Sequence, residues 1–344
     1  MVESGLILFY APDVKLSFRA KLLIKENPDV AEQVLAQLPM QGTLGHVVIS
    51  GQAIWFPTRI VHLGRNNMVQ RHPGAVYLNA VGQSLCLTYG TVTESALVNK
   101  VADVLEEDLP TLERLGYLVY EQTVTQPCRS VMTISVSLMH QKPKANGSRL
   151  AGAATISTNL DCTWRVAMHV IESQIERVWL QKPEEIEKIS WGIIESGAGS
   201  GGQCFSVMVH LKSFLLHLGC DVLYRLLKVS QYDDITLRTL IRMTREFIRD
   251  NFNTFEMLTD LGLPNMHDIG TMYSNALETL SSKEQYRQLT GALFTYVCRM
   301  HRWVHFIFPW NIGVAFPHRN AKDILSLATL VSGSSNTVSL PKAE

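Results

Sequence analysis

The sequence predicts an α+β protein in which a sheet-forming first part is followed by a helical second part. Short runs of β-branched and aromatic residues, bounded by glycine and proline, occur before residue 140. Apolar residues then recur at helical spacing from about residue 164 to residue 330. A polar segment at 141–152, which contains proline and glycine, has the composition of a linker between the two parts.

These boundaries divide the 344 residues into two domains, the number expected for this length. We expect residues 1–140 to form the catalytic β domain and residues 153–331 to form an α-helical bundle. Residues 332–344 are expected to be a flexible polar tail. The bundle carries more apolar stripes than one small β domain can cover, so we expect it to form a homodimer.

Composition argues against several classes of function. Lys plus Arg and Asp plus Glu both number 31, so the formal net charge is zero and predicts no nucleic-acid or membrane partner. The six cysteines are scattered without a C-x-x-C pair, which predicts neither a zinc site nor a redox pair. We recognise no signal sequence and no apolar run of about 18 residues, so we expect a soluble, cytoplasmic protein.

The elements of the first part can be placed in chain order. Residues 15–24 partly alternate and are expected to form a strand. The sequence Asn27-Pro28-Asp29 is a typical helix start, and Pro39 follows the expected end of that helix. Further strands are expected at 47–49, 54–56, 75–78 and 85–89, a helix at 95–105, and closing strands at 117–124 and 130–138.

The most informative stretch runs from Val47 to Gly90, where two strand pairs flank a basic connection. This connection carries Arg59, His62, Arg65, Arg71 and His72. Arginine binds carboxylates in a bidentate manner, and histidine exchanges protons near neutral pH. Glu94 follows the last strand of this stretch and is expected near the same sheet end. The pattern predicts a site for an anionic ligand, with an ordinary polar loop as the alternative.

Other motifs of the chain do not predict a cofactor or a metal. Gly197, Gly199 and Gly202 have G-x-G-x-x-G spacing, but no βαβ unit surrounds them. A loop between helices is the better interpretation, so we predict no nicotinamide cofactor. His301 and His305 are four residues apart, but the H-E-x-x-H motif is absent, so we expect a packed or interfacial pair and no metal.

Three short motifs resemble those of small bacterial cyclophilin-like barrels. They are G-Q-A-I-W-F-P at 51–57, H-P-G-A-V-Y-L at 72–78 and S-L-C-L-T-Y-G at 84–90, followed by Asn99 in the position of the asparagine of that group. Gln52 and Ala75 replace the acidic residues usual there. A barrel of this kind followed by a bundle of about 180 residues resembles the cucumopine and mikimopine synthases.

This resemblance implies an activity that composition alone does not indicate. The family consists of opine-forming enzymes carried on transferred plant-tumour DNA. Membership implies the condensation of L-histidine with 2-oxoglutarate by a Pictet–Spengler cyclisation, without a reductant or another cofactor, in the cytoplasm of the transformed plant cell. The two products, cucumopine and mikimopine, share connectivity and differ in configuration, so either is expected.

The chemistry of this reaction suggests roles for individual residues. Three substrate carboxylates need cations, the amine needs a base, and the leaving water needs an acid. Arg59 is the first choice for a carboxylate, with Arg65 or Arg71 second. The full set of expected site residues is Arg59, Arg65, Arg71, Trp55, Phe56, Tyr77 and Asn99 for substrate binding, and Glu94, His62, His72 and Tyr89 for catalysis.

Two alternatives belong to other functional classes. A peptidyl-prolyl isomerase-like peptide-binding module would use the same barrel, although the longer cyclophilin signatures are missing. A conventional NAD(P)H-dependent opine reductase would need the βαβ unit that the sequence lacks.

Overall fold

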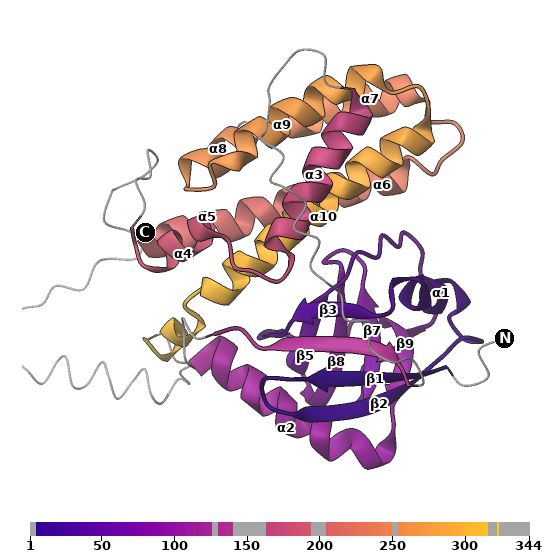
Figure 1. Cartoon of the computed structure of the whole chain (residues 1–344), viewed down its shortest axis with the longest axis vertical. Helices are drawn as coiled ribbons and strands as arrows, with labels where there is room; N and C mark the ends of the chain where they lie inside the picture. The colour runs from indigo at the N-terminus through magenta and orange to yellow at the C-terminus, as the bar shows by residue number, and fades with distance from the viewer. Residues whose placement is uncertain are drawn as a thin grey trace, which may run out of the picture. The chain divides into compact units, whose positions relative to one another are not determined.

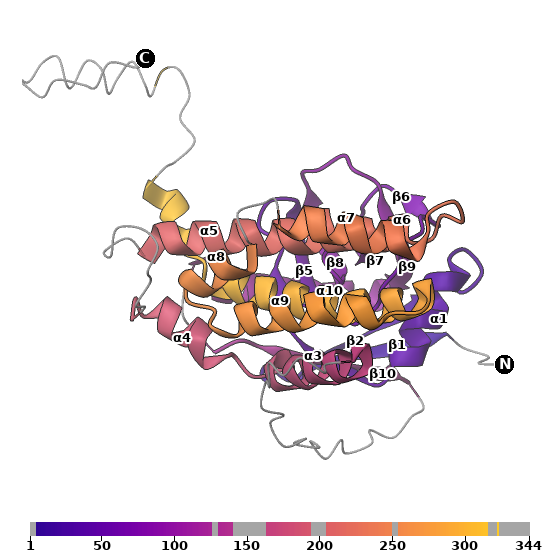
Figure 2. The same cartoon turned by 90° about the horizontal axis from the view of Figure 1, so that it is seen from above.

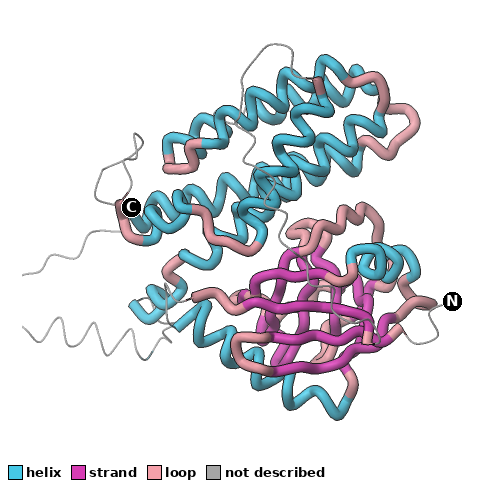
Figure 3. The backbone as a smooth tube through the Cα atoms, in the orientation of Figure 1, coloured by secondary structure: helices cyan, strands magenta, loops and turns pink. Residues whose placement is uncertain are grey.

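The computed structural model describes residues 5–125, 130–139, 163–193, 204–249, 254–315 and 322. The chain divides into two compact units, residues 1–309 and residues 310–344. The first unit contains a barrel-like sheet followed by helices (Figures 1 and 3). The second unit is described mainly as the short 3-10 helix η5 (Trp310–Ala315). The predicted linker 141–152, the glycine-rich segment 197–202 and the tail 332–344 lie outside the described residues.

A single antiparallel sheet forms the first part of the described chain. Its order is β3-β10-β1-β2-β9-β7-β8-β5-β4, and β6 pairs with β9. The strands are β1 (Leu6–Ala11), β2 (Leu16–Leu22), β3 (Met40–Thr43), β4 (Gly45–His46), β5 (Gly51–Pro57), β6 (Met68–Val69), β7 (Ala75–Asn79), β8 (Ser84–Val92), β9 (Val98–Val104) and β10 (Thr133–Leu138). Gly42 of β3 lies against Pro57 of β5, so the sheet curls until its two ends nearly meet.

The interior of this barrel is filled by side chains. The rings of Phe9 and Phe18 stack at 4.9 Å, and Phe56 meets Phe9 edge-on. Helix α1 (Pro28–Gln37) and helix α2 (Leu109–Tyr120) bury apolar faces in the same core. Because strand side chains alternate between faces, every second residue of β5, β7 and β8 points away from this core.

The structure corrects three of the expected elements. Residues 47–49 were expected to be a strand, but they form a bend between β4 and β5. Residues 95–105 were expected to be helical, but β9 is a strand that pairs with both β2 and β7, so sheet pairing overrides the helical spacing. The segment 117–124 was expected to be a strand, but it completes α2 and continues into the π-helix η2 (Glu121–Thr125). Pro110 lies in the first turn of α2, where proline is favoured.

The second part is a helical bundle, as the sequence predicts. Its described elements are α3 (Trp164–Trp179), α4 (Glu184–Ser190), α5 (Cys204–Leu216), η3 (His217–Leu223), α6 (Tyr224–Val229), α7 (Leu237–Arg249), α8 (Thr254–Asp260), α9 (Asn265–Ala276), η4 (Leu277–Thr279) and α10 (Lys283–Ile307). Helix α10 is buried along most of its length and packs against α3 and α5 (Figure 2). The Ser282 hydroxyl caps it by accepting from the Gln285 amide.

The continuous run α5–η3–α6, Cys204–Val229, is long and apolar enough to cross a membrane by length and composition. A core helix of a soluble protein has the same properties, and this run packs against α10. It also carries charged residues, among them Lys212, Asp221 and Lys228. We therefore interpret it as a bundle helix, with Phe205, Val209 and Leu216 exposed along one face.

The outer face of the sheet packs against α10. Trp55 of β5 points out of the barrel, and its ring lies 5.2 Å from Phe306 and 5.4 Å from His305. The carbonyl of His46 accepts two hydrogen bonds, from the Trp55 indole at 3.0 Å and from His305 Nε2 at 2.9 Å. His301 is also buried, so the predicted packed histidine pair is confirmed.

Three buried histidines are expected to make the folded state sensitive to acid. Burial lowers the pKa of His46 from its ordinary 6.5 to about 4, and burial lowers the pKa of His301 and His305 well below that ordinary value. As the pH falls from 6.5 towards 4, the unfolded chain therefore binds protons that the folded chain does not. The free energy of unfolding therefore decreases as the pH falls through this range. The full loss for His46 is about 3 kcal/mol.

Urea unfolding at several pH values checks this expectation. We expect the midpoint to fall between pH 6.5 and pH 4.5, and the fall to be smaller in His305→Gln, whose amide can still donate to the His46 carbonyl. The exposed residue His169 supplies the control His169→Gln, which should keep the wild-type slope. Equal slopes in His305→Gln and the wild type would contradict the assignment.

Candidate functional site

A cavity of about 380 Å³ lies between the outer face of the sheet and the bundle. Strands β5, β7, β8 and β9 form one wall, and the connection between β5 and β7 forms a second. Tyr224 and Lys228 of α6 and Arg302 of α10 line the bundle side. The volume is within the range of small-molecule sites in proteins.

The floor of the cavity is a row of three side chains on adjacent strands. Trp55 of β5 pairs in register with Cys86 of β8, and Cys86 pairs with Tyr77 of β7. All three point away from the barrel core and line the cavity. Burial raises the pKa of Cys86 to about 11 and raises the pKa of Tyr77 above its ordinary range. Both groups are therefore protonated at neutral pH, and the Tyr77 phenol remains a possible proton donor.

Cations exceed carboxylates around this floor. Arg65, Arg71, Lys228 and Arg302 line the cavity together with one carboxylate, Glu94, which leaves a formal excess of three positive charges (four minus one) among the lining residues. Such an arrangement suits a ligand with several carboxylates.

Arg71 and Glu94 form an ion pair at the edge of the cavity. Arg71 Nη1 donates to Glu94 Oε2 at 2.7 Å, and the guanidinium lies 5.4 Å from the Tyr77 ring centre. The hydrogen bond from Arg71 lowers the pKa of Glu94. Glu94 is therefore ionised at neutral pH and can accept a proton, as a general base must.

Asn99 also lines the cavity. Its Oδ1 atom accepts a hydrogen bond from Asn27 Nδ2 at 2.7 Å. Asn27 precedes α1 but makes no side-chain cap, because its amide instead contacts Asn99 and the carbonyl of Lys100. The sequence motif that ends in Asn99 therefore lies at the site.

Arg59, the first choice for a substrate carboxylate, lies away from this cavity. Its Nη1 atom pairs with Glu176 of α3 at 2.5 Å, and its guanidinium lies 4.5 Å from the Trp179 ring centre. The side chain is 40% exposed and does not line the cavity. After Pro57 the chain runs towards α3, so Arg59 lies next to that helix and not next to the cavity. Residue spacing in the sequence does not reveal this direction.

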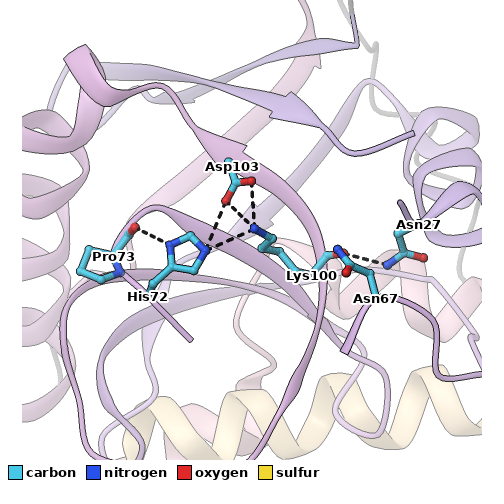
Figure 4. A network of polar contacts seen from close by, with 6 residues as sticks. All are labelled: Asn27, Asn67, His72, Pro73, Lys100 and Asp103. Carbon is cyan, nitrogen blue, oxygen red and sulfur yellow. Dashed lines mark hydrogen bonds and ion pairs between the residues drawn. The ribbon is translucent and has the colours of Figure 1, made fainter. Parts of the chain in front are cut away.

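The two histidines of the connection also lie outside the cavity. His62 is buried between Gln33, at 3.2 Å, and Asn66, at 3.0 Å, and burial lowers its pKa. His72 belongs to an exposed network with Lys100 and Asp103 (Figure 4). His72 Nδ1 donates to the Pro73 carbonyl at 2.9 Å, so Nε2 is left to accept from Lys100.

Two further residues expected at the site, Phe56 and Tyr89, are buried but do not line the cavity. Phe56 alternates with Trp55 along β5, so its ring points into the barrel core. The Tyr89 hydroxyl accepts from His46 Nε2 at 3.0 Å, because His46 Nδ1 already accepts from the Val48 amide. Of the residues expected from sequence, the structure therefore brings Trp55, Arg65, Arg71, Tyr77, Glu94 and Asn99 to one cavity.

The sequence interpretation missed the residues that the bundle contributes. Lys228 and Arg302 lie on helices whose apolar spacing indicated only packing. Arg302 lies four residues after the buried Cys298 and therefore on the same, inward side of α10. An arginine on the apolar side of a helix is the sequence signal that could have identified it as a site residue. No group of three or more metal-binding side chains occurs among the described residues.

Comparisons with known proteins agree with this architecture. Residues 164–307 match the family model described as the cucumopine synthase C-terminal helical bundle domain. A solved structure, described as McbB in complex with tryptophan, is 25% identical, with a TM-score of 0.80 over 91% of this chain and 100% of that one. The hypothetical protein AF2241 from Archaeoglobus fulgidus, at 17% identity, covers 40% of this chain and 98% of its own, but its TM-score of 0.30 supports no argument. No curated protein matches the sequence significantly.

The family match covers the bundle, and the likeness to McbB covers 91% of the chain, so it extends beyond the bundle. The predicted fold class, a barrel-like sheet followed by a helical bundle, is confirmed. Over residues 164–307 the chain is similar to the C-terminal helical bundle domain of cucumopine synthase.

Proposed function

We propose that this protein is an opine synthase that condenses L-histidine with 2-oxoglutarate by a Pictet–Spengler cyclisation, giving cucumopine or mikimopine. The observation that supports this proposal most strongly is the cavity with its excess of three positive charges over an aromatic floor. L-Histidine and 2-oxoglutarate together bring three carboxylates, the same number. Removing carboxylates from water is costly unless each meets a cation or several donors.

The aromatic floor suits an amino acid with an aromatic side chain. Trp55 and Tyr77 present rings to the cavity, and such rings pack against the faces or edges of a substrate ring. McbB, which shares the fold, was solved in complex with tryptophan, an amino acid with an aromatic heterocycle. This supports the placement of an aromatic amino acid on the floor of the cavity.

The reaction moves protons between the substrates and the site without any change in oxidation state. The deprotonated amine attacks the ketone, a C–N bond forms, and water leaves to give an imine. A carbon of the imidazole then attacks the imine carbon, and loss of the ring proton restores aromaticity. Glu94 is assigned as the base that takes a proton from the attacking amine and passes it to the ketone oxygen, so that it is free to remove the ring proton later. Tyr77 is assigned as the acid that protonates the leaving hydroxyl, and the ring proton released at the end restores its phenol.

Substrate binding would strengthen Glu94 as a base. The hydrogen bond from Arg71 lowers the pKa of Glu94, which makes the free carboxylate a weak proton acceptor. A substrate carboxylate that pairs with Arg71 would take over this bond, and the pKa of Glu94 would then rise towards its ordinary value. The base would thus gain strength when the substrate is in place.

A direct assay tests the reaction. Purified protein mixed with L-histidine and 2-oxoglutarate, without nicotinamide, is expected to form a product whose mass equals the sum of both substrates minus one water. Chromatography against both opines would identify the configuration. No product, or product only when NADPH is added, would contradict the mechanism. Isomerisation of a prolyl peptide in place of condensation would favour the peptide-binding alternative.

Glu94 and Glu176 provide a matched pair of variants, since each pairs with an arginine. Only Glu94 lines the cavity. Glu94→Gln is expected to lower kcat by about 10²- to 10⁴-fold, the usual effect of losing a general base, with little change in melting temperature. Glu176→Gln breaks the Arg59 pair and should leave kcat and both KM values unchanged. Equal effects of the two substitutions would remove Glu94 from its assigned role.

The homodimer expected from the bundle is proposed to form through α5. Phe205, Val209 and Leu216 recur at helical spacing on this helix, and each is 39–43% exposed. Burying such a face against a second copy is favourable by the hydrophobic effect. Light scattering is expected to give twice the mass of one chain, and Val209→Glu with Leu216→Glu should give a monomer. A monomeric wild type would refute the proposal.

A further inference from the structure

Arg302 is a buried cation without an anionic partner among the described residues. Only 9% of the residue is exposed, and its side chain lines the cavity from α10. Nη2 donates to Ser84 Oγ at 2.8 Å and to the Gly82 carbonyl at 3.2 Å, and the guanidinium lies 4.3 Å from the Trp55 ring centre. The buried Nε atom has no hydrogen-bond partner.

The groups around Arg302 do not neutralise its charge. Those that can become negative are Tyr77 and three thiols, those of Cys86, Cys220 and Cys298. Burial raises the pKa of each, so all four are uncharged at neutral pH. Lys212, His301 and His305 also lie close enough to interact electrostatically with Arg302, and none of them can supply negative charge.

A buried, unpaired guanidinium is costly for the fold. The cost is offset when an anion enters the adjacent cavity and pairs with it. The strongest electrostatic demand for an anion therefore lies on the bundle side of the cavity, away from the Arg71–Glu94 pair.

The sheet register sets the separation between the two arginines. Arg302 lies over Trp55 and Arg71 lies over Tyr77, and one strand, which carries Cys86, separates these two rings. Two strand spacings correspond to about 10 Å. A short dicarboxylate that lies along this row can place one carboxylate against each guanidinium.

We propose that Arg302 binds the distal carboxylate of the 2-oxo acid and makes the site selective for dicarboxylic over monocarboxylic 2-oxo acids. This proposal rests on the proposed function. In this arrangement Arg71, from the sheet domain, binds the carboxylate next to the ketone of the 2-oxo acid. Arg302, from the bundle, binds the distal carboxylate.

The turn between β7 and β8 holds Arg302 in place. A Cβ atom at Gly82 would lie 2.5 Å from Arg302 Nη2, closer than such contacts occur. Gly82 has a negative φ, so alanine is compatible with the backbone there. The substitution Gly82→Ala would therefore displace the guanidinium from the barrel side while α10 keeps its sequence.

Calorimetric binding to the full chain, without histidine, is the first test, with 2-oxoglutarate and 2-oxopentanoate as probes. The two acids have the same chain length, and only the first has a distal carboxylate. We expect the wild type to bind 2-oxoglutarate at least tenfold more tightly. Arg302→Met and Gly82→Ala should reduce this ratio to within about twofold of one. The control Arg225→Met removes an exposed arginine of α6 that does not line the cavity and should keep the wild-type ratio.

The melting temperature separates a binding role from a structural one. If Arg302 serves the ligand, Arg302→Met should melt at or above the wild-type temperature, because a buried unpaired charge is removed. Added 2-oxoglutarate should raise the melting temperature of the wild type but not that of the variant. A variant that melts lower and retains the wild-type selectivity would overturn the proposal, as would a wild type that binds both acids equally.

The experiments distinguish a failure of the subsite from a failure of the reaction. Selective binding of 2-oxoglutarate without condensation would support the Arg302 subsite and refute the proposed reaction. Condensation of histidine with both acids at equal kcat/KM would support the reaction and refute the subsite.

Discussion

The contact between Trp55 and α10 is the interaction on which the site depends. The indole ring lies beside His305 and Phe306 and beneath Arg302, and its N–H shares the His46 carbonyl with His305. One strand residue thus joins the outer face of the sheet to the central helix of the bundle. Without this contact, the floor of the cavity would be an open sheet surface exposed to water.

Alternation along the strands divides the sheet between two cores. Inward-facing residues such as Phe56 fill the barrel, whereas outward-facing residues such as Trp55 and Tyr77 join the apolar cluster of the bundle. The cavity occupies the part of this second surface that the helices leave uncovered. Its ligands therefore contact one face of a rigid sheet, which holds the row Trp55–Cys86–Tyr77 in fixed register.

Electrostatics give this cavity its chemical character. The chain as a whole has no net charge, yet the cavity concentrates positive charge around one carboxylate. The ion pair of Arg71 with Glu94 keeps that carboxylate ionised, and the unpaired Arg302 makes an anionic ligand favourable. A dicarboxylate that replaces water along this row would neutralise both ends of the site and alter the basicity of Glu94.

The sequence by itself determined the order of a sheet and a bundle, most strand positions and a basic connection that reaches the site, because alternation and composition are local properties. It could not determine the secondary structure of residues 95–105, which depends on pairing with distant strands, or of residues 117–124, which depends on packing against the sheet. It also could not separate Arg71, which lines the cavity, from Arg59 and His72, which do not. Arg302 contacts Ser84 and Trp55, which precede it by more than 200 residues in the chain. Only the tertiary structure could reveal this proximity, because it arises from the docking of α10 on the outer face of the sheet.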